Sequence, residues 1–340
     1  MRWFLLFIIF FFHLNKYSQN IDGIENFILA SQQDQEILIQ EYFKPLFSSL
    51  QTSMSEGWVK TAKPHKKLGF DFTFIMSGIN IPVYDRQFNT QVFNNITSTS
   101  TESPTIFGSN SNESYLIEFY PPDSDYSMST SFDVPNGHED LLTNKRLLLP
   151  NFQFSIGVPF KSELILRYMP ETTHKGASFR SMGVGLKHSL SQYFKPAKVT
   201  PINVSILANS SKMESVYDFG VNSQVVGENQ SINLAVVNSS VGLVASADLK
   251  LLTVYASIMQ VISKSSLNVT GSYELNYETS SAEIGEVSFV VEDPVSMVSN
   301  LNYQRKNIGL AFNFAFYNLF VDYSFQNYNS INIGLSLGFR

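Results

Sequence analysis

The chain has 340 residues, a formal net charge of −6 at pH 7 and no cysteine. The mildly acidic balance argues against nucleic acid as a partner. The lack of cysteine excludes a disulfide scaffold and a lipid-anchored lipoprotein. Charged residues make up only 15% of the chain and aromatic residues 14%, whereas ordinary soluble domains carry about 25% charged residues. This composition suits a surface that faces lipid.

The first residues have the layout of a secretory signal peptide. Arg2 precedes an apolar run from Trp3 to Phe12, and a polar stretch with Ser18 follows it. A membrane-spanning helix needs about 20 apolar residues, roughly twice the length of this run. We therefore expect residues 1–18 to be a signal peptide that is cleaved on export. No later stretch is long and apolar enough for a transmembrane helix, so strands would have to cross any membrane.

Residues 19–56 form the next unit, which we expect to be helical. Its apolar residues recur at helical intervals among polar ones, and Pro45 should kink or interrupt the pattern. Two placements are open: a plug inside a barrel, or a helix beneath the barrel in the periplasm. The apolar positions are Ile24, Phe27, Ile28, Ile37, Leu38, Tyr42, Leu46 and Leu50.

From Leu68 onward the apolar period changes to two, which is typical of strands. Phe70, Phe72 and Phe74 alternate with Asp71 and Thr73, and the same alternation recurs in residues 151–158, 162–169, 307–316 and 319–326. The second face is polar or glycine and would leave holes in a dry core, whereas a barrel lumen holds water or solute there. The pattern predicts an all-β fold, a transmembrane antiparallel up-and-down barrel over residues 57–340.

The connections and the last strand agree with this prediction. The Ser-, Thr- and Asn-rich stretch 94–146 is too long for a loop of a compact soluble domain, and we expect it to be an extracellular loop. The last strand alternates up to the penultimate Phe339, as closing strands of outer-membrane barrels typically do. The remaining length leaves room for roughly 10 to 14 strands of about 10 residues, and we expect 12 or 14.

Three stretches carry a resemblance to a known family. GWVKTAKPHKKLGFDFT (residues 57–73), LLLPNFQFSIGVPFKSELILRYMP (residues 147–170) and GVGLKHSLSQYF (residues 183–194) resemble a family of outer-membrane β-barrels of Bacteroidota-type bacteria, catalogued as a domain of unknown function. The resemblance implies an outer-membrane location and no particular chemistry. The architecture is also similar to that of long-chain fatty acid transporter barrels, which hold an N-terminal plug. The Asn-Pro-Ala motif of that plug is absent.

The sequence offers little chemistry. The histidines are scattered and lack metal-ligand spacing, and no glycine-rich phosphate loop follows a strand. His188 and Ser189 are the nearest candidates for the serine and histidine of a hydrolase. They are adjacent in a strand, however, and neighbouring strand residues point to opposite faces of the sheet. We therefore expect no catalytic, cofactor-binding or metal site and no enzymatic activity.

The charged residues on the polar face are the candidate functional residues. A charge in a dry core costs several kcal/mol, so these residues fit a wet lumen. They could line a solute pathway, or Glu163, Arg167 and Lys187 could pair across strands and brace the wall. The candidate lumen-facing residues are Asp71, Glu163, Arg167, Lys187 and Asp322.

Three functional hypotheses follow for a barrel in the bacterial outer membrane whose partners are lipid and a small molecule. The leading one is passage of a small solute, hydrophobic ones included, because a helical segment precedes a barrel with a charged lumen. The second is a surface module that uses the 94–146 loop for adhesion or docking. The third and least favoured is a hydrolase embedded in the barrel.

Overall fold

The computed structural model describes residues 23–339 except 122–123, 175, 195–200 and 220–224, so the expected signal peptide lies outside it. Ten antiparallel strands close into a barrel in the order β1-β17-β16-β15-β12-β11-β10-β9-β8-β7. The prediction of an all-β antiparallel barrel preceded by a helix is confirmed. The barrel strands are β1 (Phe70–Asn80), β7 (Arg146–Val158), β8 (Ser162–His174), β9 (Ala177–Ser189), β10 (Ile202–Asp218), β11 (Ser231–Asp248), β12 (Leu252–Thr270), β15 (Val295–Asn313), β16 (Tyr317–Phe325) and β17 (Ser330–Phe339).

The predicted count of 12 or 14 strands is wrong, because the closed barrel has ten. Two physical reasons explain the difference. Strands β10, β11, β12 and β15 have 17, 18, 19 and 19 residues, well beyond the roughly 10 assumed from membrane thickness. Other strand-like segments pair outside the barrel, in two separate sheets.

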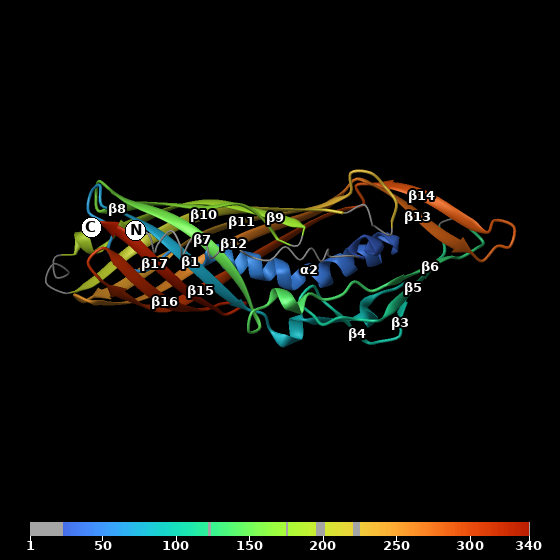
Figure 1. Ribbon diagram of the computed structural model, residues 1–340, viewed down its shortest axis with the longest axis horizontal. Coiled ribbons are helices and arrows are strands. Elements are labelled where there is room, and N and C mark those ends of the chain that lie inside the picture. The colour runs from blue at the N-terminus through green and yellow to red at the C-terminus, as the bar shows by residue number, and fades with distance from the viewer. Residues whose placement is uncertain (1–22, 122–123, 175, 195–200, 220–224, 340) are drawn as a thin grey trace, which may run out of the picture.

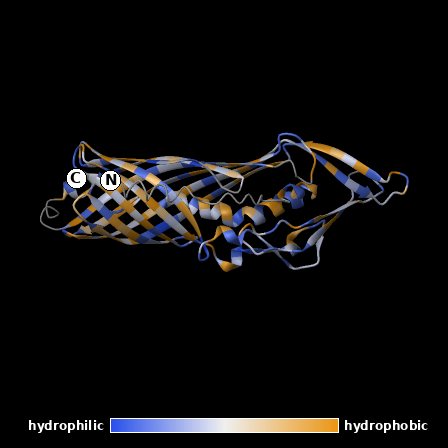
Figure 2. Ribbon diagram, in the orientation of Figure 1, coloured by the Kyte–Doolittle hydropathy of each residue, from blue (hydrophilic) through white to orange (hydrophobic). Residues whose placement is uncertain are grey.

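The barrel wall has an apolar outer face and a polar inner face. Along β1, β7 and β8, Phe72, Phe154 and Leu166 are exposed on the outside, while their neighbours Asp71 and Arg167 are buried inside. Figure 2 shows the resulting alternation of hydrophobic and hydrophilic positions along the barrel strands. Strand β17 closes the wall by pairing with both β16 and β1, up to Phe339 opposite Phe70.

A β-rich extension continues the barrel at one end (Figure 1). The segment 94–146, expected to be a long extracellular loop, contributes four strands to it. In one of them Tyr115 and Ile117 are buried while Leu116 is exposed, so the period of two is present within a Ser-rich stretch. One sheet has the order β14-β13-β6-β5-β3 and the other joins β2 to β4. Their bounds are β2 (Gln87–Asn89), β3 (Ile96–Ser98), β4 (Glu102–Pro104), β5 (Ser114–Phe119), β6 (Met128–Asp133), β13 (Ser272–Thr279) and β14 (Glu286–Glu292).

The main helix, α2 (Gln32–Ser55), runs from the extension into the barrel mouth (Figure 1). We expected Pro45 to kink or interrupt the helix; it does not interrupt it, and α2 continues through Pro45 as one element. Near its start, the buried carboxylate of Asp34 accepts hydrogen bonds from the backbone N–H groups of Asn94 and Asn95 at 2.9 and 2.7 Å. Within the described residues, no helix is both long and apolar enough to cross a membrane. The short 3₁₀ helices are η1 (Ile24–Leu29), η2 (Val83–Asp85), η3 (Thr90–Val92), η4 (Glu139–Leu141) and η5 (Ser191–Tyr193).

The larger apolar core lies in the extension, around the first half of α2. Tyr42 is fully buried there, with its ring 5.4 Å from that of Phe27, and its hydroxyl donates to the carbonyl oxygen of Asn136 at 2.8 Å. Burial raises the pKa of the Tyr42 phenol. A smaller apolar cluster inside the barrel includes Trp58 and Phe320. The first half of α2 is therefore fixed by apolar packing outside the barrel.

Candidate functional site in the barrel lumen

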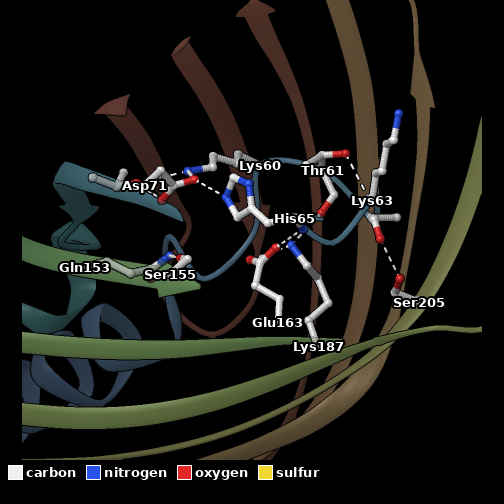
Figure 3. Close-up of polar contacts among 12 residues, drawn as sticks. Lys60, Thr61, Lys63, His65, Asp71, Gln153, Ser155, Glu163, Lys187 and Ser205 are labelled. Atoms are coloured by element: carbon white, nitrogen blue, oxygen red, sulfur yellow. Dashed lines mark hydrogen bonds and ion pairs between the residues drawn. The ribbon is translucent and has the colours of Figure 1, made fainter. Parts of the chain in front are cut away.

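Part of the polypeptide chain itself lies inside the barrel lumen. Residues 57–68, termed the luminal segment, connect the end of α2 to the start of β1, and Figure 3 shows Lys60, Thr61, Lys63 and His65 of this segment among the barrel strands. Trp58, Lys60, Ala62 and His65 of this segment are buried. The last turn of α2 is tied to the wall as well, because the side-chain amide of Asn238 donates to the carbonyl oxygen of Gln51 at 3.1 Å. The luminal segment therefore occupies the space that an open pore would need.

Asp71 of β1 holds the luminal segment at its far end (Figure 3). One of its carboxylate oxygens lies 2.5 Å from Lys60 Nζ and 2.5 Å from His65 Nε2. Lys60 Nζ also donates to the hydroxyls of Thr73 at 3.0 Å and Ser336 at 2.7 Å. Lys60 thus contacts β1 and β17, the two strands at which the barrel closes.

A second ion pair lies nearby on β8 and β9. Glu163 and Lys187 are directly opposite each other across the two strands, with Lys187 Nζ 2.9 Å from the carboxylate. The second carboxylate oxygen of Glu163 accepts from the backbone N–H of His65 at 2.8 Å, and Lys187 Nζ donates to the carbonyl oxygen of Thr61 at 3.3 Å. This pair therefore braces the wall and also binds the backbone of the luminal segment.

Arg167 meets the other end of the luminal segment. Its guanidinium lies 3.9 Å from the centre of the Trp58 ring, a cation–π distance. It also donates to the carbonyl oxygen of Glu56 at 2.8 Å. The Glu56 carboxylate lies 3.7 Å from Arg305 on β15 and accepts from Asn332 of β17 at 2.6 Å. Three wall strands thus converge on the junction between α2 and the luminal segment.

Asp322 of β16 belongs to the same junction and is hydrogen-bonded to two wall residues. Its carboxylate accepts a hydrogen bond from the Tyr255 hydroxyl at 2.8 Å and another from the Asn332 amide at 2.7 Å. Because Asn332 also donates to Glu56, it links the two carboxylates.

The buried charges of the lumen balance in sign. The acids are Glu56, Asp71, Glu163 and Asp322, and the bases are Lys60, Arg167, Lys187 and Arg305. A pore that selects ions by charge presents rings of one sign, whereas here four acids face four bases. The arrangement is suited to holding a polypeptide segment in place.

The sequence suggested that the glycines on the inner face leave holes filled with water or solute. In the structure, other parts of the chain fill the space next to several of them. A Cβ at Gly157 would lie 2.0 Å from the carbonyl oxygen of Lys66, and one at Gly185 would lie 3.0 Å from the Trp58 ring. A Cβ at Gly334 would lie 2.1 Å from the ring of Phe320. These glycines make room for the luminal segment and for large inward side chains.

Comparison with known families identifies the chain. The model of a family of unknown function, DUF6588, matches residues 1–339. The chain belongs to the DUF6588 family. No curated protein has a significant sequence match to it.

Several solved structures are similar to this member of the DUF6588 family at a low level. Ail, the attachment invasion locus protein of Yersinia pestis, aligns with a TM-score of 0.28 and 6% identity over 81% of this chain and 99% of Ail. The translocator domain of autotransporter NalP from Neisseria meningitidis aligns with a TM-score of 0.27 and 7% identity over 90% and 98%. The outer membrane protease OmpT from Escherichia coli aligns with a TM-score of 0.27 and 8% identity over 80% and 94%. Similarities this low say nothing about activity.

The structure places all five candidate residues inside the barrel. Glu163 pairs with Lys187 across strands, as the bracing alternative expected, whereas Arg167 pairs with neither and stacks on Trp58. Sequence reasoning missed their main partners. Lys60 and His65 lie in the stretch that carries the family resemblance, and extending the alternation of residues 307–316 back by two positions would have found Arg305. The missed residues are Glu56, Trp58, Lys60, His65, Tyr255 and Arg305.

The histidine considered for hydrolysis has a different partner. His188 Nδ1 lies 2.7 Å from the Ser162 hydroxyl on the neighbouring strand, and its Nε2 lies 3.0 Å from the Tyr193 hydroxyl. Ser189 is buried, and the partners of the His188 ring are Ser162 and Tyr193 instead. No carboxylate among the described residues contacts His188, so the third member of a catalytic triad is not in place. The described part of the chain also has no group of three or more His, Cys, Asp or Glu residues arranged for a metal ion.

Proposed function

We propose that the protein is a barrel of the bacterial outer membrane that takes up a small apolar molecule, with the luminal segment closing the barrel between transport events. The apolar outer face supports the membrane location, because contiguous exposed apolar surface of this extent is unfavourable in water. The lengths of the connections between strands support an orientation of the barrel in the membrane. Short turns such as 159–161, 249–251 and 314–316 lie at one end and the extension lies at the other, and outer-membrane barrels place short turns in the periplasm.

The observation that carries the transport proposal is an apolar cavity of about 90 Å³ between α2 and the wall. It lies on the extension side, where a solute would arrive from outside. Apolar cavities bind small nonpolar molecules, and an enclosed one of about 150 Å³ binds benzene. The present cavity is smaller and partly open, so it would enclose only part of a benzene-sized molecule. The cavity is lined by Ile24, Phe43, Leu46, Ile106, Leu141, Ala177, Phe179, Ser215, Tyr217, Ile232, Leu234 and Leu267.

The wall opens next to this cavity. The β7–β8 ladder ends at Phe152 opposite Tyr168, although β7 extends outward to Arg146 and β8 to His174. The ladder holds seven residue pairs, whereas a membrane-spanning strand needs about 9–11 residues. The two strands therefore separate within the expected apolar band. Leu141, just before β7, and Phe179, opposite β8, line the cavity on the two sides of this separation, which would give an apolar molecule a lateral route.

The proposal does not include enzymatic activity, because within the described residues no carboxylate joins the Ser162–His188 contact. It also does not include an open pore, because residues 57–68 fill the lumen. A surface-module role remains the second candidate, and the ordered sheets of the extension favour it.

Binding of fluorobenzene to the detergent-solubilised protein, followed by ¹⁹F NMR, tests the cavity. We expect saturable binding that Ser215→Leu weakens at least tenfold, because Ser215 lines the cavity and the larger side chain fills it. The control is Ser210→Leu, an exposed position on the same strand. Absence of saturable binding by the folded wild-type protein would overturn the cavity as a ligand site.

Uptake is tested separately in cells. Cells that produce the protein should take up an apolar fluorescent dye such as N-phenyl-1-naphthylamine faster than cells that produce the Ser215→Leu variant at equal surface abundance. Equal rates in the two strains would refute transport through this cavity.

A further inference from the structure

Strands β12 to β15 form one long bent hairpin that leaves a free edge. Strand β12 leads into β13 and β14 leads into β15, and the two bends meet at Gly271 and Asp293. Gly271 N donates to the Asp293 carboxylate at 2.9 Å, and Asp293 N donates to the carbonyl oxygen of Gly271 at 3.0 Å. Beyond the bend, β14 is the terminal strand of its sheet, and among the described residues it pairs with β13 alone.

The free edge continues along β15. Residues 295–305 of β15 pair with β12 on one side, and pairing with β16 on the other side begins only at Lys306. The described chain therefore offers an unpaired strand edge along β14 and another along residues 295–305 of β15, with Pro294, which has no backbone N–H, between them. Exposed edges are commonly protected by lysine, proline or bulges because their free N–H and C=O groups can template another strand. Along β14 itself there is neither lysine nor proline.

The apolar face of the sheet is buried on β13 but remains partly exposed on β14, the strand at the edge. On β13, Tyr273, Leu275 and Tyr277 are buried. The residue opposite Leu275 on β14 is Phe289, which packs at 6.3 Å from the Tyr277 ring yet remains 44% exposed. Figure 2 shows the hydrophobic character of β14 at the far end of the extension. A strand added alongside β14 would cover Phe289 as β14 covers β13.

The charged residues that flank β14 in the sequence are all acidic. No Lys or Arg occurs between Lys264 and Arg305. Self-pairing of two antiparallel β14 strands about Phe289 would set Glu286 of one copy against Glu292 of the other, and like charges directly opposite destabilise a strand pair. The edge is thus matched to basic residues. The acids of this stretch are Glu274, Glu278, Glu283, Glu286, Glu292 and Asp293.

We propose that β14 is a docking edge for an extended segment of a partner protein that alternates apolar residues and carries Lys or Arg near both ends. The segment adds to the sheet by backbone hydrogen bonds, its apolar side chains cover Phe289, and its basic residues meet Glu286 and Glu292. This inference is independent of the apolar cavity and of transport.

The probe is a labelled peptide, acetyl-Lys-Val-Thr-Phe-Thr-Val-Lys-amide, with binding to the detergent-solubilised protein followed by fluorescence anisotropy. A second peptide replaces both lysines by glutamate, and a third is the basic peptide with alternate backbone nitrogens methylated. We expect the basic peptide to bind at least tenfold more tightly than either of the others. Equal binding of the methylated peptide would overturn strand addition, because that peptide cannot complete the ladder.

A second experiment reverses the charge of the two glutamates on the protein. The Glu286→Lys/Glu292→Lys variant changes two exposed residues and should invert the preference between the basic and acidic peptides. Glu102→Lys/Glu171→Lys, which changes two exposed residues elsewhere, should leave it unchanged. Equal effects of the two double variants would reduce the binding to overall charge and refute the site. Concentration-dependent dimerisation that the peptide blocks would overturn the assigned partner in favour of a second copy.

Discussion

Removing the Lys60 ammonium should release the luminal segment. Lys60 Nζ contacts Asp71, Thr73 and Ser336, and the side chains of Lys60 and Asp71 are 8% and 1% exposed. Deleting one partner of a buried ion pair costs about 3–5 kcal/mol, because the other charge is left uncompensated. His65 remains within 2.5 Å of Asp71, so we expect the lower end, about 3 kcal/mol. This corresponds to roughly a 100-fold change in the equilibrium between held and released segment.

Amide hydrogen exchange of the peptide that covers residues 57–68 measures this equilibrium directly, because exchange of a protected amide reports local opening. Lys60→Met should speed exchange in this peptide about 100-fold and leave the peptides from β11 and β12 unchanged. The matched control is Lys67→Met, an exposed position of the same segment. The Lys60→Met/Asp71→Asn double variant should exchange more slowly than Lys60→Met, since it removes both charges. Wild-type exchange rates in Lys60→Met would refute the anchoring role of the ion pair.

Three further predictions concern the wall and its fit to the luminal segment. Phe154→Arg, on the outer face, should lower stability in lipid by about 2–4 kcal/mol if Phe154 faces the bilayer midplane, whereas Phe160→Arg in an exposed turn should not; equal unfolding midpoints would contradict the assigned faces. Gly157→Ala should speed exchange in residues 57–68, because its Cβ would meet backbone at 2.0 Å, while Gly78→Ala meets only side chains at 3.3 Å or more and should have little effect. Removing residues 334–340 should prevent closure, since β17 pairs with both neighbours, and heat-modifiable electrophoretic mobility of the truncated chain would count against this.

The barrel strands could be predicted from the sequence because their alternation is local. Each of the two faces contacts a uniform environment, so the period of two identifies both the strand and its buried side. The strand count could not be derived in the same way. Residues 267–278 show one unbroken alternation, yet Gly271 bends the chain there with a φ of 105° and divides it between β12 and β13. Alternation continues across such a bend and does not show which sheet a strand joins.

The candidate site could be predicted only in part. The inward direction of Asp71, Glu163 and Lys187 follows from alternation, but their partners lie in the luminal segment, which has no periodicity of its own. That segment is ordered by contacts with strands far away in the chain, such as the 2.7 Å hydrogen bond from Lys60 to Ser336. Local propensity carries no information about contacts between residues so far apart in the chain. A plug was one of the two placements expected for residues 19–56, but nothing in the sequence showed that residues 57–68 fill the lumen.

The two parts of the N-terminal region are held by different forces, and this difference determines which part can move. The first half of α2 is fixed by apolar packing around Tyr42, and withdrawing it would expose that surface to water. The luminal segment is fixed mainly by ion pairs and hydrogen bonds. Buried ion pairs contribute little net stability because desolvation offsets their attraction, and a charge that returns to water recovers its hydration. Release of the luminal segment into a hydrated lumen is therefore less costly than withdrawal of α2. Opening of the barrel should begin at residues 57–68 while the first half of α2 stays docked in the extension.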